Sequence, residues 1–199
     1  MKLNVDQYFD LASSLESGQD NRWQRQGQWY SGVIYSNLVH IQQTPFGVEF
    51  FCTPTTEAEL VHILASYFRL DDDLPAIYRE IGHDPKVAQM VSQYRGLRLL
   101  RQEPWECLIA FILSANCNIT RIAANMEKLA EHFGKRLTLG GDTRYTFPSP
   151  IKLSTANEKM LRGLGLGFRA KYVARATEAV TNGRLDLELL KHTPYDEAK

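Results

Sequence analysis

The sequence predicts an α+β fold, in which a small antiparallel sheet comes first and an all-helical body follows. Short segments rich in β-branched and aromatic residues are concentrated between residues 29 and 52. From about residue 56 onward, apolar residues recur at helical spacing instead. A chain of 199 residues can bury the core of one large or two small domains. We therefore expect a sheet domain over residues 1–70 and a helical domain over residues 71–199.

Three strands are expected in the first domain, at residues 29–35, 38–43 and 48–52. Ser36-Asn37 separates the first two strands, and Thr44-Pro-Phe-Gly47 separates the second from the third. Both connections have the composition of hairpin turns. The three strands should therefore form an antiparallel meander.

Capping signals place the helices. Thr56 precedes an apolar stripe and has Glu59 three residues later, as in a capping box. Pro104 suits the first turn of a helix, Asn118 is a candidate N-cap, and Gly134 is a candidate helix stop. Residues 135–154, with Gly140-Gly141 and two prolines, are expected to form a connecting loop. The helices expected after the first lie at residues 73–81, 85–94, 104–115, 119–133, 155–162, 169–181 and 186–191.

Composition argues against several classes of protein. The longest apolar run, residues 107–113, has seven residues, which is far too short to span a membrane. Three cysteines without paired spacing favour reduced thiols inside a cell over a disulfide framework. The five histidines show no metal-ligand spacing, so we expect neither a metal nor a cofactor.

The net charge of zero conceals an asymmetry. Residues 1–92 carry 6 Lys/Arg against 12 Asp/Glu, a net charge of −6, whereas residues 93–199 carry 17 against 11, a net charge of +6. A basic half suits a polyanion, because each neutralised phosphate releases counterions. Asymmetries of this size also arise without any such partner.

Two segments of the basic half could carry a function. Residues 161–171 contain three alternating glycines, but the flanking helices do not fit a dinucleotide fold, and a tight turn that feeds a helix near Phe168 fits better. The arginines and lysine around that helix start could bind a phosphate or could simply be solvated. In residues 114–121, helix capping accounts for Asn118, but it gives no structural role to Asn116 or Arg121.

Four segments together resemble the 8-oxoguanine DNA glycosylase family. They are Ser17-Gly-Gln followed by Arg22-Trp23, Tyr67-Phe-Arg-Leu-Asp71, residues 94–121 and residues 161–173. The resemblance runs over nearly the whole chain and implies a helix-hairpin-helix glycosylase body. It also implies excision of an oxidised purine, 8-oxoguanine opposite cytosine, from duplex DNA by base flipping, with an associated lyase activity.

The resemblance assigns roles to five residues. Gly18 matches the position whose carbonyl accepts a hydrogen bond from N7–H of 8-oxoguanine, and Asn116 matches the asparagine that fills the vacated space in the helix. Arg121 and Arg169 match the arginines that donate to the cytosine left unpaired. Phe168 matches a wedge residue, often tyrosine, beside that cytosine.

Departures from the family pattern limit these expectations. Asn21 stands where an aromatic residue is common. The helix-hairpin-helix motif, the catalytic lysine and the catalytic aspartate are expected to lie beyond Lys199, so no catalytic residue is assigned within the chain. The alternatives are a non-catalytic module that binds damaged DNA, an inactive fragment, and a structural or interaction domain. We expect a monomer without membrane association, located in the nucleus of a eukaryote or in the cytoplasm and nucleoid of a bacterium.

Overall fold

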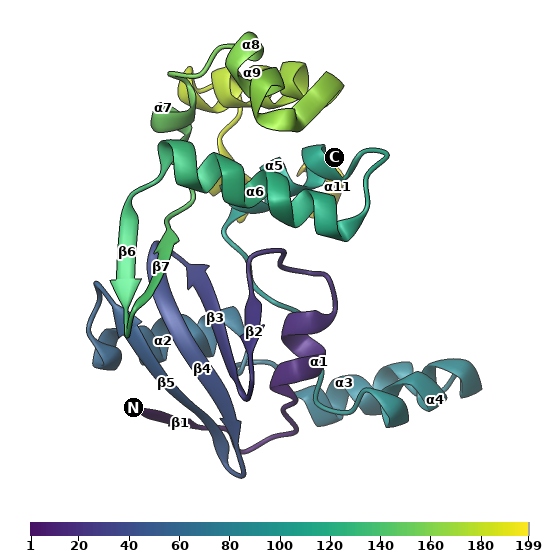
Figure 1. Cartoon of the computed structure of the whole chain (residues 1–199). Coiled ribbons are helices and arrows are strands. Elements are labelled where there is room, and N and C mark those ends of the chain that lie inside the picture. The colour runs from purple at the N-terminus through teal and green to yellow at the C-terminus, as the bar shows by residue number, and fades with distance from the viewer. Residues whose placement is uncertain (199) are drawn as a thin grey trace. The chain divides into compact units, whose positions relative to one another are not determined.

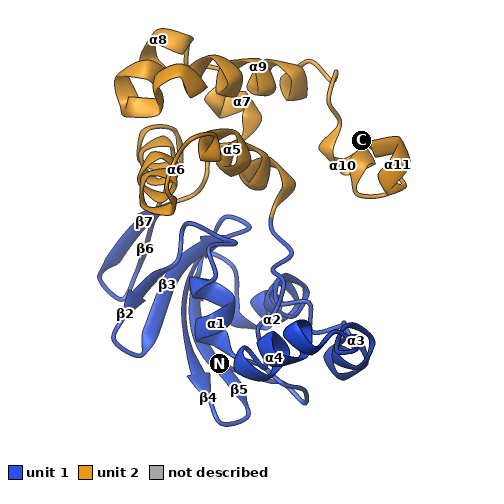
Figure 2. Ribbon diagram, turned by 90° about the vertical axis from the view of Figure 1, so that its right-hand side faces the viewer, with its two compact units in different colours: residues 1–102, 137–144 blue, residues 103–136, 145–199 orange. Residues whose placement is uncertain are grey.

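The computed structural model describes residues 1–198 and contains two compact units. The first unit comprises residues 1–102 and 137–144, and the second comprises residues 103–136 and 145–198 (Figure 2). The sequence places the boundary at residues 70 and 71, whereas the units divide after residue 102. The extension has a physical cause, because Arg98 and Arg101 donate hydrogen bonds to main-chain oxygens of Arg69 and Ser66 within the first unit.

A five-stranded antiparallel sheet forms the centre of the first unit (Figure 1). Its strands lie in the order β1-β5-β4-β3-β2, and the meander predicted from the sequence supplies the three strands at its centre and is confirmed. Tyr35 and Ser36 form the turn between β3 and β4 with φ angles of 45° and 63°, as the twist of a two-residue hairpin requires. The strands are β1 (Lys2–Asn4), β2 (Gln24–Gln26), β3 (Trp29–Ile34), β4 (Asn37–Thr44) and β5 (Gly47–Thr53).

Four helices accompany this sheet, and helices α1 and α2 contribute most to its core. Leu11 and Leu15 of α1 pack with Leu60 and Leu64 of α2 and with the buried strand residues. The capping box expected at Thr56 is present. The Thr56 side chain accepts from the Glu59 amide, and the Glu59 carboxylate accepts from the Thr56 amide. The helices are α1 (Leu11–Glu16), α2 (Glu57–Tyr67), α3 (Leu74–Ile81) and α4 (Pro85–Gln93).

The second unit is helical, and its three longest helices follow the sequence prediction within one residue. Helix α5 spans Pro104–Ser114 and helix α6 spans Ile119–Phe133, with Pro104 in the first turn and Asn118 as N-cap. The expected helix 169–181 is α9, Ala170–Thr181. Their apolar faces share one core. The remaining helices are α7 (Pro150–Leu153), α8 (Glu158–Leu161), α10 (Leu187–Leu190) and α11 (Tyr195–Ala198).

The prediction of a connecting loop at residues 135–154 is wrong in part. It contains a β-hairpin, β6 (Arg136–Leu139) and β7 (Asp142–Tyr145), as well as helix α7. Gly140 and Gly141 form its turn, with φ angles of 57° and 87°. The hairpin is bound to the first unit, because Arg144 donates hydrogen bonds to the main-chain oxygens of Ser31, at 3.1 Å, and Arg22, at 2.8 Å. The helix expected at 155–162 begins only at Glu158, after the N-cap Asn157.

Candidate nucleic-acid interface

The loop between α5 and α6 presents an exposed asparagine in an unusual conformation. Asn116 has a φ of 49°, in the left-handed region that L-residues rarely occupy and that asparagine tolerates better than most. The Cys117 amide donates to the main-chain oxygen of Ser114 at 3.1 Å, which tightens the loop. The Asn118 side chain accepts from the Arg121 amide at 2.9 Å and starts α6. Asn116 therefore lies at the tip of a short and well-defined turn.

Arg169 connects this loop to the segment that precedes α9. Its Nε donates to the main-chain oxygen of Ala115 at 2.8 Å, and its Nη2 donates to that of Asn116 at 2.6 Å. Arg169 is 4% exposed and belongs to the short 3₁₀ turn Gly167–Arg169. Two parts of the sequence more than 50 residues apart are thus held together by one guanidinium group.

Phe168 lies beside that guanidinium group. The Arg169 Cζ lies 4.6 Å from the centroid of the Phe168 ring, which is a cation–π geometry. The ring is also 49% exposed. An exposed aromatic ring therefore lies next to a buried arginine in the second unit.

The glycine-rich segment before Phe168 forms a turn that leads into a helix, as the sequence predicts, but the turn is wide. Arg162–Leu166 form a wide helical turn in which Gly165 has a φ of 94°, and Gly167 follows with a φ of 61°. Arg162 is paired with Glu158 at 2.7 Å, so part of its charge is already neutralised. Lys171 and Arg175 are exposed on α9, and Arg121 is exposed in the first turn of α6. The exposed cations of these two helices are available to a polyanion.

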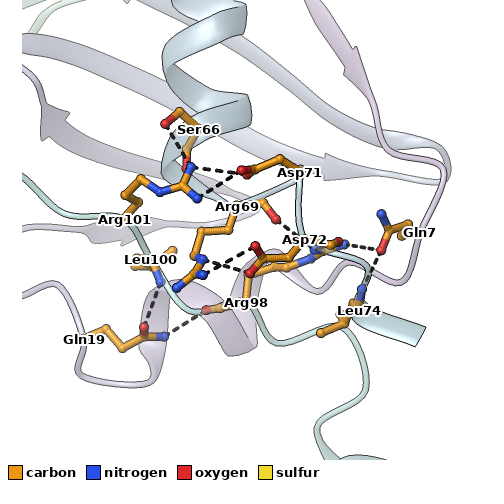
Figure 3. Close-up of polar contacts among 10 residues, drawn as sticks. All are labelled: Gln7, Gln19, Ser66, Arg69, Asp71, Asp72, Leu74, Arg98, Leu100 and Arg101. Carbon is orange, nitrogen blue, oxygen red and sulfur yellow. Dashed lines mark hydrogen bonds and ion pairs between the residues drawn. The ribbon is translucent and has the colours of Figure 1, made fainter. Parts of the chain in front are cut away.

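Gly18 lies in the first unit, directly after α1, with a φ of 81°. The next residue, Gln19, anchors this turn through its side chain (Figure 3). Its Nε2 donates to the main-chain oxygen of Arg98 at 3.0 Å, and its Oε1 accepts from the Leu100 amide at 2.9 Å. A side chain is disfavoured at a φ of 81°, so glycine is the residue that suits this backbone.

A hollow of about 460 Å³ adjoins this turn in the first unit. Ser17, the neighbour of Gly18, contributes to its wall, and Tyr94 and Leu97 contribute apolar surface. Its lining residues are Ala12, Ser13, Glu16, Ser17, Tyr94 and Leu97.

The structure brings together some of the residues selected from the sequence. Arg169 contacts both Asn116 and Phe168 within the second unit, and Arg121 follows on the helix that the same loop begins. Gly18 belongs to the first unit. Lys199 lies outside the described residues. Among residues 1–198, no group of three His, Cys, Asp or Glu side chains is arranged to hold a metal, and no helix is long and apolar enough to cross a membrane.

Sequence reasoning gave no role to two residues that support Gly18. Gln19 and Arg98 occur in segments that carry the resemblance, but the hydrogen bond between them joins residues 79 positions apart. Arg98 is 2% exposed and donates to the main-chain oxygens of Arg69 and Tyr8, each at 3.1 Å. A cationic residue inside an otherwise apolar segment, Leu97-Arg-Leu-Leu100, was the only local signal.

Comparison with known proteins gives consistent matches. A family model described as the N-terminal domain of 8-oxoguanine DNA glycosylase matches residues 2–108. An N-glycosylase/DNA lyase of Saccharomyces cerevisiae is 33% identical over 203 residues, covering 93% of this chain and 53% of the relative. The N-glycosylase/DNA lyase OGG1 of Arabidopsis thaliana is 33% identical over 180 residues, covering 85% and 48%. The chain thus spans about half the length of these curated relatives.

A solved structure matches as well. The Clostridium acetobutylicum 8-oxoguanine glycosylase/lyase, in complex with double-stranded DNA containing cytosine opposite 8-oxoguanine, superposes with a TM-score of 0.91 at 33% identity. The match covers 96% of this chain and 66% of that protein. The likeness therefore includes both compact units.

Proposed function

The chain belongs to the 8-oxoguanine DNA glycosylase family, and on that premise we propose that it acts in DNA base-excision repair by recognising 8-oxoguanine opposite cytosine in duplex DNA. The observation that carries the proposal is the loop of Asn116, which is held in a left-handed conformation next to an exposed aromatic ring and exposed cations. The expected activity of the family is N-glycosylase with DNA lyase. No residue among 1–198 is proposed as its nucleophile.

Gly18 is proposed to distinguish the oxidised base from guanine. In 8-oxoguanine, N7 carries a hydrogen and can donate to a main-chain carbonyl, whereas N7 of guanine is an acceptor whose lone pair would face the carbonyl lone pairs. A backbone without a β-carbon allows close approach of a ligand. The bonds of Gln19 to Arg98 and Leu100 support this role, because they fix the turn on which the discrimination depends.

The second unit is proposed to stabilise the DNA from which the base has been extruded. Extrusion costs a few kcal/mol in lost stacking and pairing, so new contacts have to offset it. Asn116 would occupy the vacated space, and the Phe168 ring would stack beside the unpaired cytosine. Arg121 and Arg169 would donate to the acceptor edge of that cytosine, which accounts for a preference for cytosine opposite the lesion.

The test is equilibrium binding of the 199-residue chain to a duplex with 8-oxoguanine opposite cytosine and to the same duplex with guanine. We expect tighter binding to the lesion duplex. Borohydride trapping on the same lesion duplex separates recognition from chemistry, because a covalent adduct would reveal a competent amine within residues 1–199. Equal affinity for the two duplexes would contradict the proposed recognition.

The proposal extends to assembly and location. The protein is proposed to bind duplex DNA as a monomer and to work where genomic DNA lies, the nucleus in a eukaryote or the nucleoid in a bacterium. Size-exclusion chromatography coupled to light scattering tests the first part, and a dimer mass would contradict it.

A further inference from the structure

Arg169 combines strong burial with bonds to the main chain of the DNA-facing loop. We propose that Arg169 is a positioning residue, which fixes Asn116 in its DNA-reading conformation before DNA binds. This inference rests on the proposed function. It adds a role in the free protein to the contact with cytosine proposed above. At 4% exposure in the free protein, Arg169 presents little surface to a base, whereas its bonds to the loop are already made.

The geometry of the two hydrogen bonds suits arginine alone among the cationic residues. Nε and Nη2 donate to the successive main-chain oxygens of Ala115 and Asn116 at 2.8 and 2.6 Å. A guanidinium group presents its donors in a rigid planar fork, so both bonds form in one orientation. A lysine ammonium is a single point charge and does not impose that orientation.

Asn116 needs such support because its backbone is strained. A φ of 49° is unfavourable for a residue with a β-carbon and persists where the surroundings enforce it. The Arg169 bond to the Asn116 carbonyl, together with the Cys117 bond to Ser114, restrains the peptide groups on both sides of that φ. Loss of the Arg169 bonds should release the residue to ordinary negative φ values.

Electrostatics supports the same role. Within residues 1–198, no carboxylate is paired with Arg169. Its charge is offset instead by the two carbonyls just beyond the C-terminal end of α5, where the helix dipole is negative, and by the Phe168 ring at 4.6 Å. Two of its five N–H groups are used on the loop.

The experiment uses NMR on the free chain with Arg169→Lys and a matched control, Lys171→Ala. A positive φ brings the amide and α protons of Asn116 close together, which a strong intraresidue nuclear Overhauser effect reports, and ¹⁵N relaxation reports order. We expect Arg169→Lys to lose both signatures and Lys171→Ala, an exposed residue, to keep them. If Arg169→Lys does not fold, Arg169→Gln allows the same comparison.

DNA binding completes the test. We expect Arg169→Lys to lower affinity for the 8-oxoguanine duplex by about tenfold or more, since two hydrogen bonds are lost, with a smaller loss on undamaged duplex. Retention of the Asn116 signatures in Arg169→Lys would overturn the positioning role, even if DNA binding fell. Failure of the wild-type chain to select the lesion would refute the proposed function, and the NMR comparison on free protein would still decide the positioning role.

Discussion

Arg98 is an individual residue on which the first unit depends. Its guanidinium is 2% exposed and donates to main-chain oxygens of Arg69 and Tyr8, so it joins the segment after α2 to the segment before α1. Burial lowers the pKa of Arg98, which shows how far the charge is removed from water. The stabilisation therefore comes from the hydrogen bonds that the guanidinium donates to main-chain carbonyls of separate segments.

We expect Arg98→Met to lower the free energy of unfolding by about 2–3 kcal/mol, since the buried hydrogen bonds from the guanidinium to Arg69 and Tyr8 are lost. Arg101→Met is the control, because Arg101 pairs with Asp71 at 3.1 Å on a partly exposed surface. Such a pair contributes about 1 kcal/mol or less. Urea denaturation followed by circular dichroism measures both, and equal losses would contradict the distinction.

Asp142 provides a prediction about pH. Ser31 Oγ donates to its Oδ2 at 2.5 Å, and His40 Nε2 lies 3.0 Å from the same oxygen. Burial raises the pKa of Asp142, but the hydrogen bonds from Ser31 and His40 outweigh burial, so the pKa lies below its usual value. A carboxyl group with a depressed pKa in the folded state stabilises the protein above its unfolded pKa of about 3.9, and that contribution is lost as the pH falls through the folded value.

We therefore expect Asp142→Asn to lower the unfolding free energy by about 1–2 kcal/mol at neutral pH, where the ionised carboxylate accepts both bonds. The difference between wild type and variant should shrink as the pH is lowered from about 5 to below 4. Glu80→Gln, on an exposed carboxylate of α3, is the control and should show no such trend. A difference that stays constant with pH would show that the Asp142 charge is unimportant.

At the scale of an element, the junction between α6 and β6 depends on the absence of a side chain. A β-carbon on Gly134 would collide with the main-chain oxygens of Thr146 and, at 2.6 Å, Ala130. The backbone of Gly134 is extended, with a φ of −85°, so crowding and not a positive φ accounts for the glycine. We expect Gly134→Ala to cost about 1–3 kcal/mol of stability, as overpacking does.

Gly163 is the matched control for this substitution. A β-carbon there would meet no atom within 4 Å among the described residues, and its φ is not positive. Gly163→Ala should leave stability unchanged or raise it by up to about 1 kcal/mol, because alanine restricts the unfolded chain. Thermal unfolding of the two variants side by side measures the contrast, and similar melting temperatures would refute it.

An element can be predicted from the sequence when neighbouring residues stabilise it, and not when contacts distant in sequence do. Helices α5 and α6 were predicted to within a residue, because Pro104 and Asn118 mark their starts within the local sequence. The sequence does not predict hairpin β6–β7, because it is held by hydrogen bonds that Arg144 donates and Asp142 accepts, with partners more than 100 positions away. Helix α1 has only six residues, too few to show a clear period.

The candidate site divides in the same way. Asn118 can be assigned from local capping rules, whereas the roles of Gly18, Asn116 and Arg169 follow only from the family resemblance. No local pattern indicates that Arg169 is buried, since its acceptors lie 53 and 54 residues earlier in the chain. Residues whose role depends on contacts distant in sequence cannot be recognised from spacing alone.

On the scale of the whole molecule, the charge asymmetry gives the DNA proposal a quantitative test. The excess of positive charge in residues 93–199 predicts that log K for duplex binding falls linearly with log salt concentration. Exposed cations of the second unit, such as Lys171 and Arg121, should contribute to binding in different ways, because a phosphate contact is indifferent to sequence and a base contact is not.

We expect Lys171→Ala to weaken binding to lesion and undamaged duplexes alike and to reduce the salt slope by about 1, as the loss of one phosphate contact does. Arg121→Ala should instead weaken binding to the lesion opposite cytosine by about 1–3 kcal/mol and reduce the preference for cytosine over adenine at that position. Fluorescence anisotropy titrations at several salt concentrations, with cytosine or adenine opposite the lesion, measure both effects. If Arg121→Ala acts equally on both opposing bases, the residue contacts the backbone and the cytosine preference has to arise elsewhere.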